Sequence, residues 1–443
     1  MNAQLVRQLP KEFSVPRGMK DIEPQEMAKR VWAEAKILGV LQRYGFKVVE
    51  PTPLEHLETL EAKSGPQIRN EVYWFADKAG RNLGLRFDLT VGMARMVADR
   101  YDLPEPIKLC AIADAWRYDE PQFGRFRHFR QWDAEIFGSS DPLADAEAIC
   151  VGMDILDSVG LKEYEVRINN RKLIESFLHR IGVETGEQVE GTLIVIDKLS
   201  KFSAAQIEEE FEKTGLSAEQ TSAIRELCSI RGPPEKVLSE LSGLLKEDPG
   251  STAGQVELAR LADILKALGK KDRCAYDLSV VRGIGYYDGI VFEAYDKAGE
   301  NIGSIFGGGR YDKLCGIYGK QERPATGVAG GIERLMISLE KSSLYPNLPE
   351  TPRVYVASAT EDVLPRALEI VRELRQTGVA TDFDMKGRSL QKQLEYARSM
   401  KIPYVVIVGR KELDKGSVRL REMESRKEKE TKIDEAVKEL KMA

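Results

Sequence analysis

The sequence contains 443 residues, of which 42% are hydrophobic and 31% charged, and its net charge at pH 7 is −5. This composition is typical of a globular protein of about three domains, and no apolar run approaches the ~20 residues that cross a bilayer. The first residues lack the apolar core of a secretion signal, so we expect a cytoplasmic protein with no membrane partner. The negative net charge excludes a globally basic nucleic-acid-binding protein, so any such surface must be local.

Cysteine and histidine are sparse and scattered. The five cysteines form no CxxC pair, and none of the three histidines is paired with another at helical spacing. Neither a disulfide framework nor a zinc ribbon is indicated. We therefore expect no tightly bound metal with protein ligands.

The first predicted element is a long amphipathic helix that begins near residue 21. Asp21 is its expected N-cap, Pro24 lies in the first turn, and Gly45 ends it. The helix is expected to place four apolar side chains near one face: Met27, Val31, Leu38 and Leu41. A short strand in "FKVVEPTPLE" follows, and its prolines close it.

Further along, strand-like and helical stretches divide the chain into segments. "IKLCAIADAWRY" and "FRQWDAEIFG" predict strands, whereas charged helical runs such as "AAQIEEEFEKTGL" predict an insertion between two strand-rich parts. The segment 342–352 contains prolines and indicates a linker. Beyond it, strands and helices alternate, which predicts a small α/β domain with a largely parallel sheet.

The end of the chain differs from the rest in charge. Residues 351–443 carry 20 Lys and Arg against 16 Asp and Glu, a net charge of +4, which leaves −9 for the rest. This separation favours a module that binds a polyanion such as RNA, although a solvated face explains it about as well.

Two common nucleotide-binding motifs are excluded. No GxxxxGK[ST] occurs, which excludes a P-loop, and "GIGYYDG" is followed by a strand where a dinucleotide fingerprint needs a helix. Several arginines instead lie beside glycine or aromatic residues. Planar guanidinium groups suit phosphate oxygens and aromatic rings. These arginines are Arg117, Arg282, Arg310 and Arg334.

Several segments of the sequence resemble motifs of a known family. "WRYDEPQFGRFRHFRQWDAEIFG" resembles motif 2 of class II aminoacyl-tRNA synthetases, "ATGVAGGIERL" resembles motif 3, and the first helix with "FKVVEPTPLE" is a weaker match to motif 1. "RGIGYYDG" resembles the signature of histidyl-tRNA synthetases, and "PRGMKDI" and "LRFDLTVGMAR" resemble other segments of that family. The likeness covers about residues 16–339, and the tail resembles a class II anticodon-binding domain.

The resemblance implies an α+β fold with an antiparallel-sheet catalytic domain. Residues 1–170 would hold motifs 1 and 2, and residues 261–341 would hold the histidine signature and motif 3. Residues 171–260 would form the mostly helical insertion, and residues 353–443 would form the α/β anticodon-binding domain.

For ATP, the resemblance implies contacts from motifs 2 and 3. Arg117 would grip the α-phosphate, and Arg334 would stack on adenine opposite Phe129. Asp119 and Arg125 match neighbouring positions that contact ATP. An ordinary surface role is the alternative for a lone arginine, but it explains poorly two arginines within these motifs.

For histidine, the resemblance implies a polar pocket. The α-ammonium would be held by Asp88, Thr90 and Gln131, and the imidazole would be read by Glu135 and Tyr287, with Tyr311 lining the pocket. A carboxylate and a phenol can engage both ring nitrogens. Tyr286 would lie on the opposite side of an extended chain, so we expect it to pack in the core.

Arg282 has the central catalytic role that the resemblance implies. With Arg117 it would neutralise charge as the histidine carboxylate attacks the α-phosphate and pyrophosphate leaves. Nearby glycines would let the ligand approach, although Gly285 replaces a residue that is usually acidic in the family. Gln122 and Arg127 would face the extra 5′ nucleotide of histidine tRNA.

The expected activity is that of a histidine–tRNA ligase. ATP, accompanied by Mg²⁺, would activate L-histidine, and the product would be transferred to the 3′ end of histidine tRNA. A homodimer built through motif 1 follows from the resemblance. Two alternatives stay open: a synthetase-like regulatory subunit that senses histidine without aminoacylation, and a non-catalytic RNA-binding module.

Overall fold

The computed structural model describes residues 13–64, 66–120, 123–199, 203–244, 249–282, 286–299, 302–348 and 352–442. The chain forms two compact units, Met1–Tyr345 and Pro346–Ala443. The boundary between them falls inside the predicted linker. The finer division of the first unit stays a prediction.

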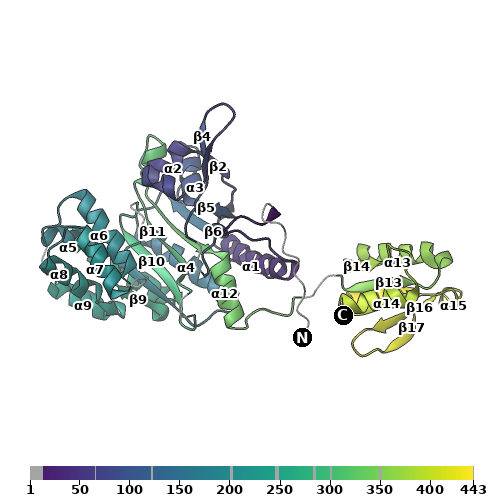
Figure 1. Ribbon diagram of the computed structural model, residues 1–443. Coiled ribbons are helices and arrows are strands. Elements are labelled where there is room, and N and C mark those ends of the chain that lie inside the picture. Colours follow the sequence, from purple (N-terminus) through teal and green to yellow (C-terminus); the bar gives the residue numbers. More distant parts are fainter. Residues whose placement is uncertain are drawn as a thin grey trace. The chain divides into compact units, whose positions relative to one another are not determined.

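A nine-stranded sheet is the centre of the first unit, with the strand order β1-β5-β6-β12-β11-β10-β7-β9-β8 (Figure 1). Only the β1–β5 and β7–β9 pairs are parallel, and the other neighbours are antiparallel. The strands are β1 (Lys47–Val48), β5 (Ile107–Trp116), β6 (His128–Phe137), β7 (Tyr164–Asn170), β8 (Arg231–Gly232), β9 (Cys274–Asp277), β10 (Ile290–Asp296), β11 (Ser304–Arg310) and β12 (Ala325–Gly331).

Helices cover both faces of this sheet. The main core contains side chains from α1 (Pro24–Arg43), α4 (Pro142–Ser158) and α12 (Ile332–Lys341) together with those of the strands. A second cluster joins the opposite face to α3 (Thr90–Val97) and α11 (Leu314–Tyr318). The polar residues described below share this second side with α3.

Helix α1 begins later than predicted and buries a different face. Its N-cap is Glu23 rather than Asp21, because Pro24 disfavours helical backbone in the residue before it. Gly45 has φ 77° just beyond the helix, as expected for its end. The buried residues are Ala33, Ile37, Val40 and Leu41, so the predicted face was wrong except for Leu41. Met27 and Val31 are 41% and 53% exposed.

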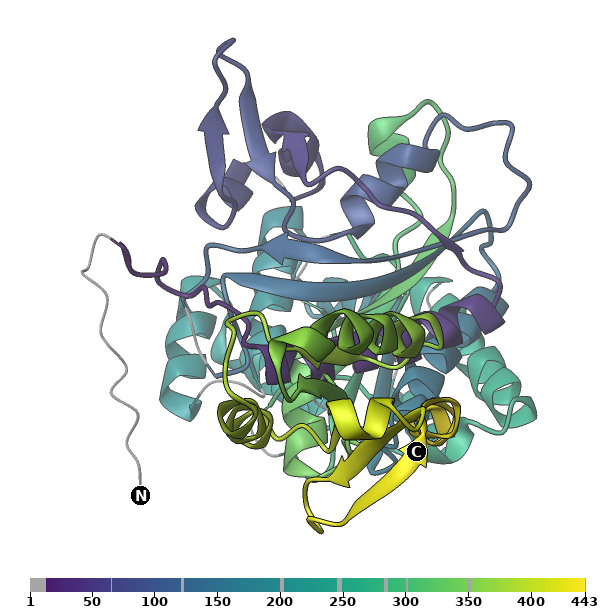
Figure 2. The same ribbon diagram turned by 90° about the vertical axis from the view of Figure 1, so that its right-hand side faces the viewer.

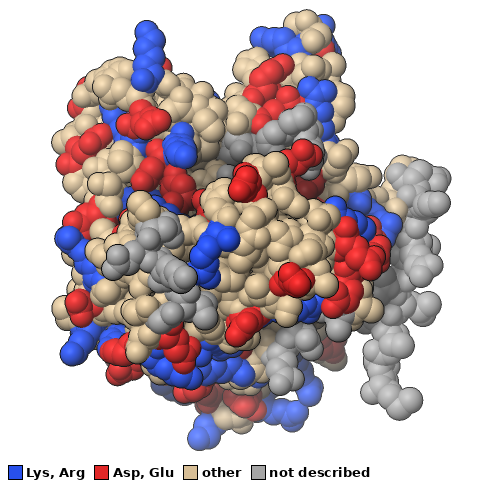
Figure 3. All heavy atoms as spheres, turned by 90° about the vertical axis from the view of Figure 1, so that its left-hand side faces the viewer, with Lys and Arg blue, Asp and Glu red and all other residues tan. Residues whose placement is uncertain are grey.

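The segment after β7 consists mostly of helices. Serine N-caps with complete capping boxes start α7 and α8, which explains why these helices begin where they do. Basic and acidic side chains are interspersed on the face that carries these helices (Figure 3). The helices are α5 (Arg171–Arg180), α6 (Gly186–Lys198), α7 (Ala204–Lys213), α8 (Ala218–Cys228), α9 (Pro234–Leu244) and α10 (Pro249–Ala267), and the 3₁₀ turn η3 (Lys271–Arg273) follows them.

A small three-stranded sheet, in the order β2-β4-β3, completes the first unit. It consists of β2 (Leu54–His56), β3 (Trp74–Ala76) and β4 (Asn82–Leu85), with α2 (Leu57–Ser64) and η2 (Pro66–Asn70) between β2 and β3. The hairpin of β3 and β4 extends away from the large sheet (Figure 2).

The second unit has a five-stranded sheet in the order β14-β13-β15-β16-β17. The first three strands are parallel, whereas β16 and β17 are antiparallel, so the prediction of a largely parallel sheet holds for three strands only. The connection from Val408 to Ser417 is shorter than the ~10–12 residues that a parallel crossover needs. Its elements are β13 (Val354–Ser358), η4 (Glu361–Val363), α13 (Leu364–Gln376), β14 (Thr381–Phe383), α14 (Leu390–Ser399), β15 (Tyr404–Val408), α15 (Arg410–Leu413), β16 (Ser417–Glu422), β17 (Glu428–Lys432) and α16 (Ile433–Met442).

Candidate active site

Three polar residues at alternate positions of β6 face the same side of the large sheet. Successive side chains of a strand point to opposite faces, so Gln131, Asp133 and Glu135 share one face, while Trp132 and Ala134 belong to the main core. The three polar side chains are at most 5% exposed. Buried polar side chains at this density need specific partners.

Asp133 lies at the centre of this polar group. Its Oδ2 accepts hydrogen bonds from Thr90 Oγ1 at 3.3 Å and Gln131 Nε2 at 3.1 Å, whereas its Oδ1 is buried without a hydrogen-bond partner. Burial, and then repulsion from Glu135 and Asp88, raises the pKa of Asp133 well above its usual value. Concentrated acidic groups of this kind favour a bound cation such as an ammonium group.

Asp88 is placed by the turn that starts α3. Its Oδ1 accepts a hydrogen bond from the backbone N–H of Val91 at 3.1 Å, and Thr90 is the first residue of the helix. Both side chains are 6% exposed. The three residues predicted for the α-ammonium, Asp88, Thr90 and Gln131, therefore all adjoin Asp133, which the sequence analysis missed.

A carboxylate and two phenols form the next part of the pocket. The Tyr311 hydroxyl donates to Glu135 Oε2, and both side chains are 1% exposed. Burial, with the charge of Glu135 next, raises the pKa of Tyr311 well above its usual value, so the phenol stays a hydrogen-bond donor. The ring of Tyr287 lies 6.4 Å from that of Tyr311. The site can thus offer both a hydrogen-bond acceptor and a donor.

Tyr286 lies on the same side as Tyr287, contrary to the prediction. The two rings are 4.4 Å apart, the Tyr286 hydroxyl donates to the Tyr287 hydroxyl at 3.2 Å, and the Tyr286 ring lies 5.7 Å from that of Tyr311. The premise of an extended chain was wrong, because residue 286 lies in a turn. Tyr286 does pack against an apolar cluster, and it also borders the pocket.

Glycines in β11 and β12 leave the space that these side chains occupy. Gly327 pairs across the strands with Glu135, and a Cβ atom there would lie 1.5 Å from Glu135 Oε2. Gly307 pairs with Glu293, and a Cβ atom there would lie 2.5 Å from Arg282 Nη1. At these positions any side chain would displace a polar group of the site.

Four arginines converge beside this pocket. Burial lowers the pKa of Arg334, and repulsion from Arg125, Arg117 and Arg282 adds to the shift, while Glu293 opposes it. Arg334 donates to the carbonyl oxygens of Gly124 at 3.3 Å and Ser304 at 3.0 Å. Guanidinium groups clustered in this way favour a ligand with several negative charges.

The Arg117 side chain is held by one backbone carbonyl and one aromatic ring. Its Nε donates to the carbonyl of Phe87 at 2.9 Å, and its guanidinium lies 5.1 Å from the ring centroid of Phe129. The aromatic ring predicted to face a nucleotide base therefore lies against a guanidinium of the same cluster.

Arg282 forms an ion pair inside the site. Its Nη1 lies 2.5 Å from Glu293 Oε1, and its guanidinium lies 5.8 Å from the ring of Tyr287. Arg282 thereby links the arginine cluster to the tyrosines. The sequence analysis missed Glu293, and only the cross-strand pairing of β10 and β11 brings it to the site.

The remaining motif 2 residues lie near Asp119. Arg125 forms an ion pair with Asp119 at 3.5 Å, and Arg127 Nε donates to the Asp119 carbonyl at 2.9 Å. The Arg127 guanidinium stacks 4.0 Å from the ring centroid of Tyr118. Gln122, predicted for the same loop, and Gly285 lie outside the described residues.

Arg310 has a structural partner. It donates to Asp145 Oδ2 at 2.6 Å and to the carbonyl of Ser139 at 2.8 Å, and its side chain is 4% exposed. The hydrogen-bond donors of Arg310 are thus used by protein groups, which indicates a structural role.

Within the described ranges, no three His, Cys, Asp or Glu side chains are grouped to hold a metal ion. None of the described helices is long and apolar enough to cross a bilayer. The cysteines are free, and burial raises the pKa of Cys110 to about 11 and that of Cys150 to about 12, so these thiols stay protonated at neutral pH.

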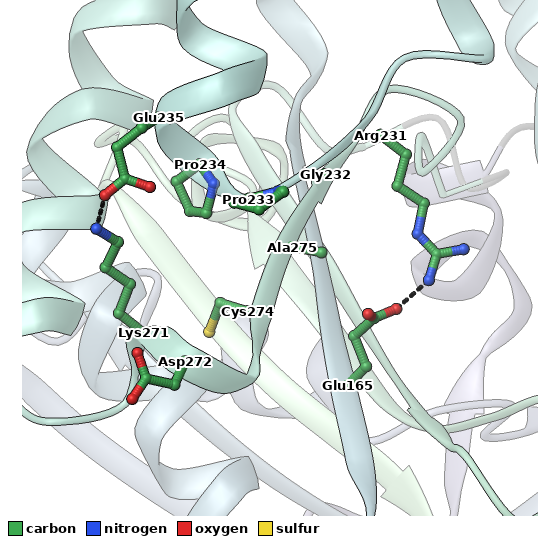
Figure 4. A pocket seen from close by; sticks show the side chains of 10 residues that line it. All are labelled: Glu165, Arg231, Gly232, Pro233, Pro234, Glu235, Lys271, Asp272, Cys274 and Ala275. Carbon is green, nitrogen blue, oxygen red and sulfur yellow. Dashed lines mark hydrogen bonds and ion pairs between the residues drawn. The ribbon is translucent and has the colours of Figure 1, made fainter.

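A hollow of about 650 Å³ lies elsewhere, at the β8–β9 edge of the sheet (Figure 4). The ion pairs Arg231–Glu165 and Lys271–Glu235 lie on its opposite walls. Four of its five charged lining residues are thus paired with one another, and the hollow contains none of the predicted site residues. Its lining also includes Gly232, Pro233, Pro234, Asp272, Cys274 and Ala275.

Comparisons with known proteins agree along nearly all of the chain. A family model described as Histidyl-tRNA synthetase matches residues 18–335, and one described as Anticodon binding domain matches residues 353–442. The chain is 38% identical over 427 residues to the histidine–tRNA ligase of Thermococcus kodakarensis, covering 96% of this chain and 97% of the relative. It is 35% identical over 411 residues to that of Haloarcula marismortui, covering 92% and 93%.

Solved structures also match. The histidyl-tRNA synthetase from Nostoc sp. PCC 7120 has a TM-score of 0.82 at 30% identity, covering 97% of this chain and 99% of that one. An ATP phosphoribosyltransferase regulatory subunit/histidyl-tRNA synthetase from Bacillus halodurans C has a TM-score of 0.71 at 24% identity, covering 85% and 93%. The second likeness shows the fold alone.

The mostly antiparallel sheet, its arginine cluster and the following α/β unit define a class II aminoacyl-tRNA synthetase with an anticodon-binding domain. The predicted α+β fold class is thereby confirmed. The chain belongs to the histidyl-tRNA synthetase family, which also confirms the resemblance found in the sequence.

Proposed function

We propose that the protein is a histidine–tRNA ligase that activates L-histidine with ATP and transfers it to the 3′ end of histidine tRNA. One observation carries this proposal: a buried acidic and phenolic pocket directly adjoins a cluster of four arginines. The pocket suits a small cationic amino acid with a polar ring. The cluster suits a polyphosphate.

The hydrogen bonds and contacts of the buried pocket residues indicate how L-histidine would bind. Asp88, Thr90 and Gln131 would bind the α-ammonium, helped by the charge of Asp133. Glu135 would accept a hydrogen bond from one imidazole nitrogen, and Tyr287 and Tyr311 would complete the ring pocket. A site built on buried polar pairs can reject apolar analogues by about 10⁴ to 10⁵ without editing.

The nucleotide end uses the arginines. Arg117 and Arg282 would contact the α-phosphate, and Arg334 with Phe129 would enclose adenine, while Asp119 and Arg125 would contact the rest of ATP. The nearby carboxylate of Asp119 is a hard oxygen donor that suits Mg²⁺. When bound with ATP, Mg²⁺ would neutralise charge on the phosphate oxygens.

The tRNA would contact both units. Arg127, with Gln122, would face the acceptor end from the motif 2 loop, and the second unit would bind the anticodon. Arg127 is half-buried against Tyr118. The change Arg127→Ala should impair transfer to tRNA more than adenylate formation, because a single contact to a base edge is typically worth about 1–3 kcal/mol.

A homodimer through motif 1 is part of the proposal. Met27 and Val31 on α1 and Val48 on β1 are 41%, 53% and 56% exposed. Met27 and Val31 are four residues apart on α1 and so lie on one helix face. Exposed apolar side chains on one face favour a protein contact, and a second copy would cover them. Sedimentation of the purified chain would test this, and a monomer at micromolar concentration would contradict it.

ATP–pyrophosphate exchange measured with each of the twenty amino acids tests the activity. Exchange should depend on histidine alone. A regulatory subunit would bind histidine without supporting exchange, and an RNA-binding module would bind tRNA without a response to histidine. Either result would overturn the proposed function.

A further inference from the structure

Glu293 holds more partners than a strand carboxylate usually has. Its Oε1 accepts hydrogen bonds from Arg282 Nη1 at 2.5 Å and Ser304 Oγ at 3.4 Å, and its Oε2 accepts from the Tyr295 hydroxyl. The residue is 7% exposed. A buried, multiply bonded carboxylate has one well-defined position, so the guanidinium paired with it is held as well.

Arg282 depends on such a partner because its backbone conformation is unfavourable. Its φ is 57°, in the left-handed region that costs a residue with a Cβ atom roughly 1–2 kcal/mol. Its guanidinium lies in the space that the missing side chain of Gly307 leaves open, across the strand pair from Glu293. A strained residue at a ligand-binding site persists only where its surroundings hold it.

The Arg282 guanidinium has a hydrogen-bond donor left for a ligand. Its Nε is buried without a hydrogen-bond partner, while Nη1 is engaged by Glu293. An unpartnered buried donor is costly unless a ligand completes it. The pairing with Glu293 therefore orients Arg282 without using all its donors.

Further side chains hold the Glu293 carboxylate in place. Tyr295 lies two residues along β10 from Glu293, and its hydroxyl donates to Glu293 Oε2. The Arg167 guanidinium lies 4.2 Å from the Tyr295 ring centroid, and Arg167 Nε donates to Glu165 at 3.1 Å. These contacts link the middle of the sheet to the catalytic arginine.

We propose that Glu293 is a positioning residue that fixes the guanidinium of Arg282 so that its free edge faces the α-phosphate during histidine activation. This inference rests on the proposed function. Glu293 itself would not touch the reacting atoms: it acts through Arg282, and Tyr295 acts through Glu293.

The test is a double-mutant cycle on the full-length protein, measured by histidine-dependent ATP–pyrophosphate exchange. Glu293→Gln keeps the shape of the side chain and removes its charge. It should lower kcat about 10-fold to 100-fold, as small misplacements of reacting groups do, and change the KM for ATP less than about threefold. Arg282→Ala combined with Glu293→Gln should be no slower than Arg282→Ala alone, because residues that act as a unit are not additive.

Glu257→Gln is the matched control. Glu257 is a partly buried carboxylate paired with Lys172 at 2.5 Å in the insertion, and its loss should leave kcat unchanged. Tyr295→Phe, which removes one hydroxyl from the other oxygen of Glu293, should lower kcat by about two- to tenfold. If Glu293→Gln does not fold, a fall in kcat of Tyr295→Phe with little change in the KM for ATP tests the proposal instead.

Three results would overturn the proposal. One is a kcat for folded Glu293→Gln within about twofold of wild type, far short of the expected loss. Another is a fall in kcat of the double mutant that equals the product of the falls in the two single mutants. The third is recovery of Glu293→Gln by excess Mg²⁺, which would make Glu293 a metal ligand instead. Absence of histidine-dependent exchange in the wild type would contradict the proposed function itself, before any variant is compared.

Discussion

Glu135 and Gly327 are directly paired across β6 and β12, and a methyl group on Gly327 would lie 1.5 Å from Glu135 Oε2. The carboxylate that would read the imidazole therefore occupies the space of a missing side chain. The same relationship recurs between Gly307 and the guanidinium of Arg282. Glycines shape both ends of the proposed site.

Gly327→Ala should consequently displace Glu135 and break its hydrogen bond to Tyr311. We expect the KM for histidine in pyrophosphate exchange to rise at least about tenfold and stability to fall by about 1–3 kcal/mol, as for other overpacked sites. Gly331→Ala, on the same strand with nothing within 4 Å of the added atom, is the control and should behave as wild type. Equal effects of both substitutions would contradict the role of Gly327.

Asp133→Asn should weaken histidine binding while stabilising the fold at high pH. Because the pKa of Asp133 is raised on folding, its contribution to stability is present below the unfolded pKa of about 3.9 and lost as pH rises through the folded pKa. The neutral asparagine avoids this loss, so at pH 8 its unfolding temperature should equal or exceed that of the wild type.

The same substitution should alter the pH dependence of histidine binding. Ionised Asp133 favours the α-ammonium, so the wild-type KM for histidine should fall as pH rises through the pKa of Asp133. Asp133→Asn should raise the KM about 10-fold to 100-fold and remove this part of the profile. The free substrate titrates identically in the two experiments, so the difference between the two profiles reports the change at Asp133. Parallel profiles would be evidence against the assignment.

Arg310→Ala tests a structural role. Removing one partner of the buried Arg310–Asp145 pair leaves an uncompensated charge, which typically costs about 3–5 kcal/mol. Thermal unfolding should shift sharply downward. Arg282→Ala should instead lower the exchange rate by about 10² to 10³ with little change in ATP binding. A catalytic defect in Arg310→Ala without loss of stability would reverse these assignments.

Removal of the second unit after Tyr345 should separate the two steps of the proposed reaction. Each unit has its own apolar clusters, so the first should fold alone. Histidine-dependent exchange should persist, whereas tRNA charging should fall sharply. Equal loss of both activities in a folded truncation would show that the second unit serves the catalytic site.

Much of this architecture could be read from the sequence. Local patterns located β5, β6, the helices after β7 and the change to an α/β unit, because periodicity and turn residues act over a few positions. Motif spacing identified the family. The alternation of Gln131, Asp133 and Glu135 along one strand could also have indicated Asp133.

Only the tertiary structure decided which groups meet. In the structure, Glu293 forms an ion pair with Arg282, and Gly327 pairs across the strands with Glu135. The rings of Tyr286 and Tyr287 are in contact, and Arg310 forms an ion pair with Asp145. The tertiary structure also left Met27 and Val31 exposed on a helix whose pattern predicted their burial. Strand register, turns and helix packing depend on contacts between residues far apart in the chain, and these cannot be deduced from local periodicity.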